Sequence, residues 1–175
     1  VAFYNFGDVG QNEDDRIVSG YKYEGVVVPQ IQYLSNNRSI ALKDNGFTIY
    51  QGSQIPKEVK TIETDKEIVS TFYDDDMVGL VFKNDSKDKQ YIMEVYNTAD
   101  GKLKFKEDFN IPYTTIKLSG GNILMYNSSQ MCVMNSRGVQ KYLGSVDGTI
   151  KDFFKIGMNR YLLVLDSGVD VIKLS

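Results

Sequence analysis

Three consecutive carboxylates, Asp74, Asp75 and Asp76, form the densest group of side chains in this sequence that could carry chemistry. Carboxylate oxygens are the ligands that hard cations prefer, so a metal ion is conceivable at this position. The surrounding residues do not have the spacing of a calcium-binding loop, and consecutive acids at a hairpin tip more often form a solvated turn. The sequence therefore assigns no metal ligand, and it gives the triplet as one part of a candidate contact surface.

Other oxygen-bearing side chains give weaker signals. The segment 84–88 alternates such side chains but lacks the Gly and the closing Glu of an EF-hand loop, so it is predicted to be a hairpin loop. Glycoside hydrolysis needs two acids about 5 to 9 Å apart in a cleft. Acids such as Glu58, Glu63 and Glu107 are predicted in outer strands, which favours exposure. A carbohydrate-active hydrolase or lyase that uses loop carboxylates stays open as an alternative function.

The sequence contains no His and a single Cys. Without His there is no usual general base, no imidazole zinc ligand and no Ser–His or Cys–His nucleophile pair. Cys132 lies between Met131 and Val133 and is predicted to be a small buried hydrophobic residue. No phosphate-binding loop pattern opens a helix anywhere. We therefore expect no catalytic residue, no cofactor and no metal site, and an enzyme is not the favoured class.

Twelve Tyr and no Trp make the tyrosines the main candidates for a contact surface. Tyr33, Tyr73 and Tyr126 fall at strand positions where packing explains them. Tyr21 and Tyr23 are predicted in an outer strand of an incomplete unit, and they are the candidate contact patch. The formal net charge of -3, from 20 basic and 23 acidic residues, gives no electrostatic footprint for nucleic acid or an anionic membrane surface. The expected partner is a protein or a glycan.

The candidate residues lie within a sequence repeat of about 40 residues. Apolar runs end on an Asp or Asn at intervals of 40, 43 and 39 residues (44 to 84, 84 to 127, 127 to 166), and these turn residues are Asp44, Asn84, Asn127 and Asp166. An aromatic or branched residue precedes each turn and marks an earlier strand, and further apolar runs follow the turns. Four short antiparallel strands in about 40 residues are typical of a β-propeller blade. A meander sandwich or barrel with accidental spacing is the alternative.

The repeat predicts an all-β, β-propeller-like fold in one domain over 1–175, with about four units of four antiparallel strands. The units are approximately 1–28 (partial), 29–68, 69–110, 111–150 and 151–175 (partial). Incomplete units at both ends leave open strand edges, which invite pairing. We expect part of a larger propeller, completed by its own N-terminal strands, by a missing N-terminal half or by a second copy.

Two sets of residues resemble known propeller families. The segment 96–105 resembles the turn of quinoprotein-type repeats, with Phe105 where those carry Trp, and no cofactor is carried over. The segments 1–13 and 117–127, together with 159–161 and 166–168, resemble the C-terminal half of an uncharacterised propeller-like family from Gram-positive bacteria. This resemblance extends over essentially the whole chain.

The resemblance implies a single-pass membrane protein with an exported propeller domain and no assigned function. The chain itself shows no signal or span, so any membrane contact is expected only through a span absent from it, and the expected location is the extracellular side of the cytoplasmic membrane. The favoured function is a non-enzymatic binding or scaffold module. Besides the hydrolase or lyase, a purely structural, self-assembling half-propeller is the remaining alternative.

Overall fold

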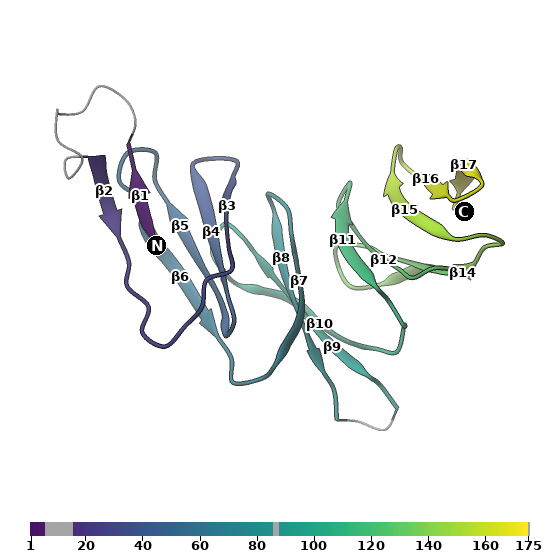
Figure 1. Ribbon diagram of the computed structural model, residues 1–175, viewed down its shortest axis with the longest axis horizontal. Helices are drawn as coiled ribbons and strands as arrows, with labels where there is room; N and C mark the ends of the chain where they lie inside the picture. The colour runs from purple at the N-terminus through teal and green to yellow at the C-terminus, as the bar shows by residue number, and fades with distance from the viewer. Residues whose placement is uncertain (6–15, 86–87, 175) are drawn as a thin grey trace.

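The computed structural model describes residues 1–5, 16–85 and 88–174, which form 17 strands. Figure 1 shows the strands as a row of sheets that runs from the N-terminal to the C-terminal end of the chain. The strands are β1 (Ala2–Tyr4), β2 (Ile17–Gly20), β3 (Gln30–Leu34), β4 (Arg38–Lys43), β5 (Gly46–Gln51), β6 (Lys57–Glu63), β7 (Ile68–Tyr73), β8 (Met77–Lys83), β9 (Tyr91–Asn97), β10 (Leu103–Phe109), β11 (Thr115–Ser119), β12 (Asn122–Tyr126), β13 (Gln130–Met134), β14 (Gln140–Ser145), β15 (Ile150–Lys155), β16 (Arg160–Leu165) and β17 (Gly168–Lys173).

Consecutive strands pair antiparallel in simple meanders. Blade 1 (β3–β6), blade 2 (β7–β10) and blade 3 (β11–β14) each have four strands, whereas blade 4 (β15–β17) has three and the N-terminal unit (β1–β2) has two. The prediction of an all-β fold built from four-stranded, propeller-like units is confirmed. The sheets do not close into a ring, as in part of a propeller. Within the described residues, no strand pairs with the second edge of β1 or of β17.

The predicted turns lie where the repeat places them. Each blade ends its second strand immediately before its turn residue, and these four residues are Asp44, Asn84, Asn127 and Asp166. Gly46 (φ 141°) and Gly168 (φ 149°) begin the third strands of blades 1 and 4 in a conformation that L side chains rarely adopt. Local turn chemistry therefore sets the registers of these hairpins.

Apolar clusters between neighbouring blades form the core. The second strands of blades 2 and 3, β8 and β12, are sandwiched between neighbouring sheets, so their side chains are buried on both faces and their sequences are nearly continuous hydrophobic runs. Along β8, Val78 and Leu80 face blade 1 while Met77 and Val81 face blade 3. Each such side chain contributes about 1.5–3 kcal/mol when buried. The core is a series of layers, and each layer holds two neighbouring blades together.

The N-terminal unit differs from the prediction in one respect. Tyr21 and Tyr23 are predicted in the outer strand of this unit, but β2 ends at Gly20. Tyr21 and Tyr23 lie in the segment that follows, where Tyr21 still exchanges two backbone hydrogen bonds with Val1 at 2.7 and 2.8 Å and both rings pack against blade 1. Residues 6–13 of the motif at 1–13 lie outside the described residues, as do Ser86 and Lys87 of the predicted loop.

No helix within 1–5, 16–85 and 88–174 is both long and apolar enough to span a membrane.

Candidate functional site

Tyr21 and Tyr23 lie together between the N-terminal unit and blade 1. The Tyr21 hydroxyl donates to the Pro56 carbonyl oxygen at 2.9 Å and accepts from the Glu58 N–H at 3.1 Å. The Tyr23 hydroxyl is hydrogen-bonded to the hydroxyl of Tyr50. Both rings are half-buried. These contacts fix the orientation of the two tyrosines and leave part of each ring accessible.

A groove of about 530 Å³ lies beside the two tyrosines. It lies over the beginning of β1 and the segment after β2, which are joined where the Tyr21 N–H donates to the Val1 carbonyl oxygen at 2.7 Å. The groove is lined by Val1, Ala2, Gly20, Tyr21, Lys22, Tyr23, Val26 and Val28. It thus combines apolar side chains, two rigid aromatic rings and one cation.

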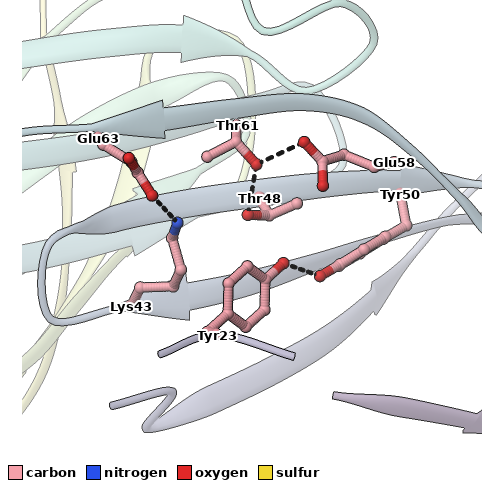
Figure 2. Close-up of polar contacts among 7 residues, drawn as sticks. All are labelled: Tyr23, Lys43, Thr48, Tyr50, Glu58, Thr61 and Glu63. Carbon is pink, nitrogen blue, oxygen red and sulfur yellow. Dashed lines mark hydrogen bonds and ion pairs between the residues drawn. The ribbon is translucent and has the colours of Figure 1, made fainter. Parts of the chain in front are cut away.

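Polar side chains of blade 1 lie next to Tyr23, and Figure 2 shows their contacts. The side chain of Lys43 is fully buried, its ammonium lies 3.0 Å from a carboxylate oxygen of Glu63, and it sits 4.9 Å from the centre of the Tyr23 ring. Next to it, the hydroxyls of Thr48 and Thr61 are hydrogen-bonded at 2.8 Å. A buried cation needs such partners because desolvation without them is costly. Lys43 therefore holds Tyr23 against blade 1.

Tyr50 is the fully buried aromatic residue of this cluster. Burial, reinforced by the hydrogen bond with Tyr23, raises the pKa of Tyr50 well above its ordinary value. The phenol therefore stays protonated. Its ring also contacts Phe3 edge-on, with the ring centres 5.0 Å apart. Tyr50 joins the N-terminal unit, the tyrosine segment and blade 1.

Lys43 and Tyr50 are not predicted as site residues from the sequence. Lys43 follows an apolar run, so the sequence predicts a turn position for it. Tyr50 is predicted to be an ordinary strand residue. The available signal was the alternation in β4, where Ser39, Ala41 and Lys43 share one face while Ile40 and Leu42 share the other. That alternation indicates that one face of blade 1 differs from the apolar faces of the other blades.

The structure places the acidic triplet in the turn between β7 and β8. The Asp74 carboxylate accepts from the N–H groups of Asp76 at 2.9 Å and Met77 at 2.8 Å, which closes the turn. The Asp75 carboxylate accepts from the Ser35 N–H of blade 1 at 2.7 Å. Two of the three carboxylates therefore hold the turn and connect two blades.

The structure does not bring the triplet and the tyrosines into one surface. The triplet contacts the end of β3, whereas the tyrosines contact β1, β5 and the start of β6. Among the described residues, no group of three or more Cys, Asp or Glu side chains could hold a metal ion. A contact role for either set stays a prediction.

Cys132 is buried between blades 2 and 3. Burial raises the pKa of its thiol to about 12, so the reactive thiolate is not formed near neutral pH. Its role is packing.

Comparison with known proteins identifies the family. The sequence matches the family described as "Family of unknown function (DUF5711)" over residues 1–174. The chain belongs to this family. No curated protein matches the sequence.

Solved structures similar to this DUF5711 chain are propeller proteins. BamB from Moraxella catarrhalis matches with a TM-score of 0.52 and 12% identity, covering 95% of this chain and 46% of that one. The WD40 domain of SCAP from fission yeast matches with a TM-score of 0.60 and 11% identity, and the match covers 86% of this chain and 43% of that one. BBS1N in complex with ARL6DN matches with a TM-score of 0.54 and 8% identity, and the match covers 87% of this chain and 54% of that one. At these identities the likeness shows the fold alone, and the DUF5711 chain spans about half the length of these structures.

Proposed function

We propose that this DUF5711 chain is a non-enzymatic binding or scaffold module, and that the groove beside Tyr21 and Tyr23 is its ligand surface. The observation that carries this proposal is the groove itself, which is lined by two tyrosines fixed by hydrogen bonds and by apolar side chains such as Val26 and Val28. Fixed aromatic rings give a large contact area at a low entropic cost. The ligand that fits best is an extended segment of a protein, and a glycan is the second ligand class.

The carboxyl groups favour binding over the hydrolase or lyase alternative. A glycosidase needs one acid with a raised pKa. In the described part of the chain, four carboxyl groups have a pKa below the ordinary value, and these groups are Glu94, Asp100, Asp152 and Asp166. Their hydrogen bonds and nearby lysines favour the charged form, which suits structural roles.

We also propose that the module lies on the extracellular side of a Gram-positive cytoplasmic membrane, anchored through a span absent from this chain. The family resemblance motivates this location. Protease treatment of intact cells that express the tagged full-length protein tests it, because an exported propeller is digested while a cytoplasmic control protein survives. Protection of both proteins would contradict export.

Photo-crosslinking tests the binding surface. Lys22 lines the groove and is exposed, and Lys141 is an exposed lysine of β14 that serves as the matched control. A photo-reactive side chain at position 22 should capture a specific partner that position 141 does not. Lys22→Glu should then weaken binding of the purified partner at least tenfold, while Lys141→Glu leaves it unchanged. Equal capture at both positions, or unchanged affinity in Lys22→Glu, would argue against the groove.

The structural alternative, a half-propeller that assembles with its own copy, predicts a concentration-dependent dimer. Light scattering separates it from the proposal, which needs no self-association.

A further inference from the structure

A groove lies between the fourth strands of blades 2 and 3. Two hollows of about 220 Å³ and 300 Å³ share Asn110, Ile111 and Leu143 in their linings, so they join into one groove. β10 of blade 2 forms one wall and β14 of blade 3 forms the other. Both walls belong to complete four-stranded blades, so the incomplete units at the two ends of the row do not contribute to this groove.

The floor of the groove is apolar. Phe109, Ile111 and Met134 line it and are between 3% and 7% exposed. On the β14 wall, Leu143 is 51% exposed. It pairs with Cys132, whose side chain lies in the core between blades 2 and 3, so Leu143 points to the same side of the sheet. An apolar group of a ligand can therefore cover a leucine that the described chain leaves in contact with water.

The β10 wall carries a carboxylate. Phe105, Glu107 and Phe109 are every second residue of the strand and share one face, and both phenylalanines pack into the core with blade 3. Glu107 therefore points into the groove, and it is exposed. Within the described residues, Glu107 has no hydrogen-bond or ion-pair partner for its carboxylate. The strand carboxylates Glu94 and Asp152, in contrast, are each paired with a lysine.

The formal charge of the groove is negative. Among the residues that line it, Glu107 and Asp108 are acidic and Lys89 is the basic one, which gives a charge of -1. The three side chains form no ion pair with one another among the described residues. The ligand group that complements this groove is therefore a cation.

The equivalent position of blade 3 is filled by the chain itself. An Asn closes the turn after the third strand in the same way in blades 2 and 3. The Met four residues before this Asn pairs with Glu107 in blade 2 and with Gly144 in blade 3, so these two positions are equivalent. A Cβ at Gly144 would lie 2.2 Å from the Tyr142 hydroxyl, so the Tyr142 side chain occupies this place. Blade 2 instead has a carboxylate there that is open to the groove.

An extended polypeptide matches the arrangement of these groups. Its successive side chains point to opposite sides, so a segment that lies lengthwise between β10 and β14 presents alternate residues to the two walls. A basic residue can then reach Glu107 while the next residue, if apolar, covers Leu143. The exposed amides of Asn110 and Gln140 line the same groove and can hydrogen-bond to the backbone of such a segment.

We propose that the groove between β10 and β14 binds an extended segment of a partner protein in which Lys or Arg stands next to an aliphatic or aromatic residue. The basic side chain pairs with Glu107, and its apolar neighbour packs on Leu143 and the apolar floor. This groove lies between blades 2 and 3, whereas the tyrosine groove is lined by residues between 1 and 28. The proposal therefore does not depend on the function proposed for the tyrosine groove.

A library of random nine-residue peptides displayed on phage is the probe. The library is first depleted on the immobilised Glu107→Lys variant, which removes peptides that bind elsewhere, and is then selected on the unmutated chain. The peptides that are retained should carry Lys or Arg next to an aliphatic or aromatic residue. The proposal is wrong if no peptide survives the depletion, or if the retained peptides have no basic residue.

A retained peptide, synthesised with a fluorescent label, then gives affinities by anisotropy. Glu107→Lys and Leu143→Ser should each weaken its binding at least tenfold. The matched controls are Asp170→Lys, an exposed acid of blade 4, and Leu103→Ser, because Leu103 is also 51% exposed but does not line the groove. Both controls should leave the affinity unchanged, and a loss in each control equal to that in its partner variant would overturn the proposal.

A measurement on the unmutated chain avoids dependence on the folding of the variants. Saturating peptide should shift the amide NMR signals of residues 107–111 and 140–145 more than those of β1 and β2. Lys22→Glu should leave the affinity for this peptide unchanged, which separates this proposal from that for the tyrosine groove. Larger shifts in β1 and β2, together with weaker binding in Lys22→Glu, would place the peptide in the tyrosine groove and overturn the proposal. A dimer that Glu107→Lys dissociates would assign the groove between β10 and β14 to a second copy and would overturn it as well.

Discussion

At the scale of single residues, Asp152 shows how one carboxylate connects two neighbouring blades. It accepts hydrogen bonds from Lys117 across the blade interface, from the Tyr126 hydroxyl at 3.0 Å and from the Phe153 N–H at 2.7 Å. Burial alone would raise the pKa of Asp152, but these hydrogen bonds outweigh it and the pKa is lowered. The charged form is therefore the one that stabilises the contact between blades 3 and 4.

Asp152→Asn should reduce the free energy of unfolding at pH 7 by about 0.5–1 kcal/mol, because the carboxylate is partly exposed and its ion pair is screened. A carboxyl group whose pKa is lower in the folded state adds stability above its unfolded pKa of about 3.9, and this stability disappears as the pH falls through the folded value. The difference between the two proteins in urea unfolding should therefore shrink between pH 5 and pH 2.

Asp170→Asn is the control, because Asp170 is an exposed residue of β17, and its effect should stay within about 0.5 kcal/mol. A difference for Asp152→Asn that does not change with pH would contradict the assigned role of the charge.

The site residues could be predicted from the sequence only in part. Tyr21 and Tyr23 stand out because their type and spacing are visible along the chain. Lys43 does not stand out, because its burial depends on the Tyr23 ring, twenty positions away in the sequence and in another unit. A lysine is read as exposed unless its partners are known.

At the scale of elements, β8 contains a glycine that its neighbouring strand requires. Gly79 pairs with Phe72 of β7, and a Cβ at Gly79 would lie 2.0 Å from the Phe72 ring. The absent side chain leaves room for the ring to lie flat over β8, where Phe72 is almost fully buried. This close approach is a feature of the hairpin and is independent of turn geometry.

Gly79→Ala should lower the free energy of unfolding by about 1–3 kcal/mol, because the added methyl group forces the Phe72 ring out of its position. Gly20→Ala is the matched strand control, since its nearest contact would be an ordinary 4.0 Å. Urea unfolding of both variants measures the difference. Equal effects of the two substitutions would rule out overpacking as the cause.

The strands of the complete blades could be predicted because the signals are local. An Asp or Asn after an apolar run fixes each turn, and the 40-residue spacing then gives the four-stranded unit. The end of β2 could not be predicted in this way. The residues that follow it are apolar enough to continue a strand, but their rings find partners in blade 1, and long-range packing overrides local preference.

At the scale of the whole molecule, each unit contacts only its neighbours in the row, as in repeat proteins whose stability is a sum of units and interfaces. Blades 1, 2 and 3 have a neighbour on both sides, whereas the N-terminal unit and blade 4 have one each among the described residues. The N-terminal interface is the least apolar over the described ranges, where Phe3, Ala41 and Tyr50 are its buried residues. Stability should therefore be highest in the middle and lowest at the two ends.

Native-state hydrogen exchange tests this gradient. The amides of β8, β12 and β13 should exchange most slowly, because these strands are paired on both edges and buried on both faces. The amides of β1, β2 and β17 should exchange fastest. Lys43→Met should accelerate exchange in the N-terminal unit without changing β12, because Lys43 holds only that interface. Uniform protection over all blades would instead mean that the chain opens as one cooperative unit, and the description as a stack of separable layers would be wrong.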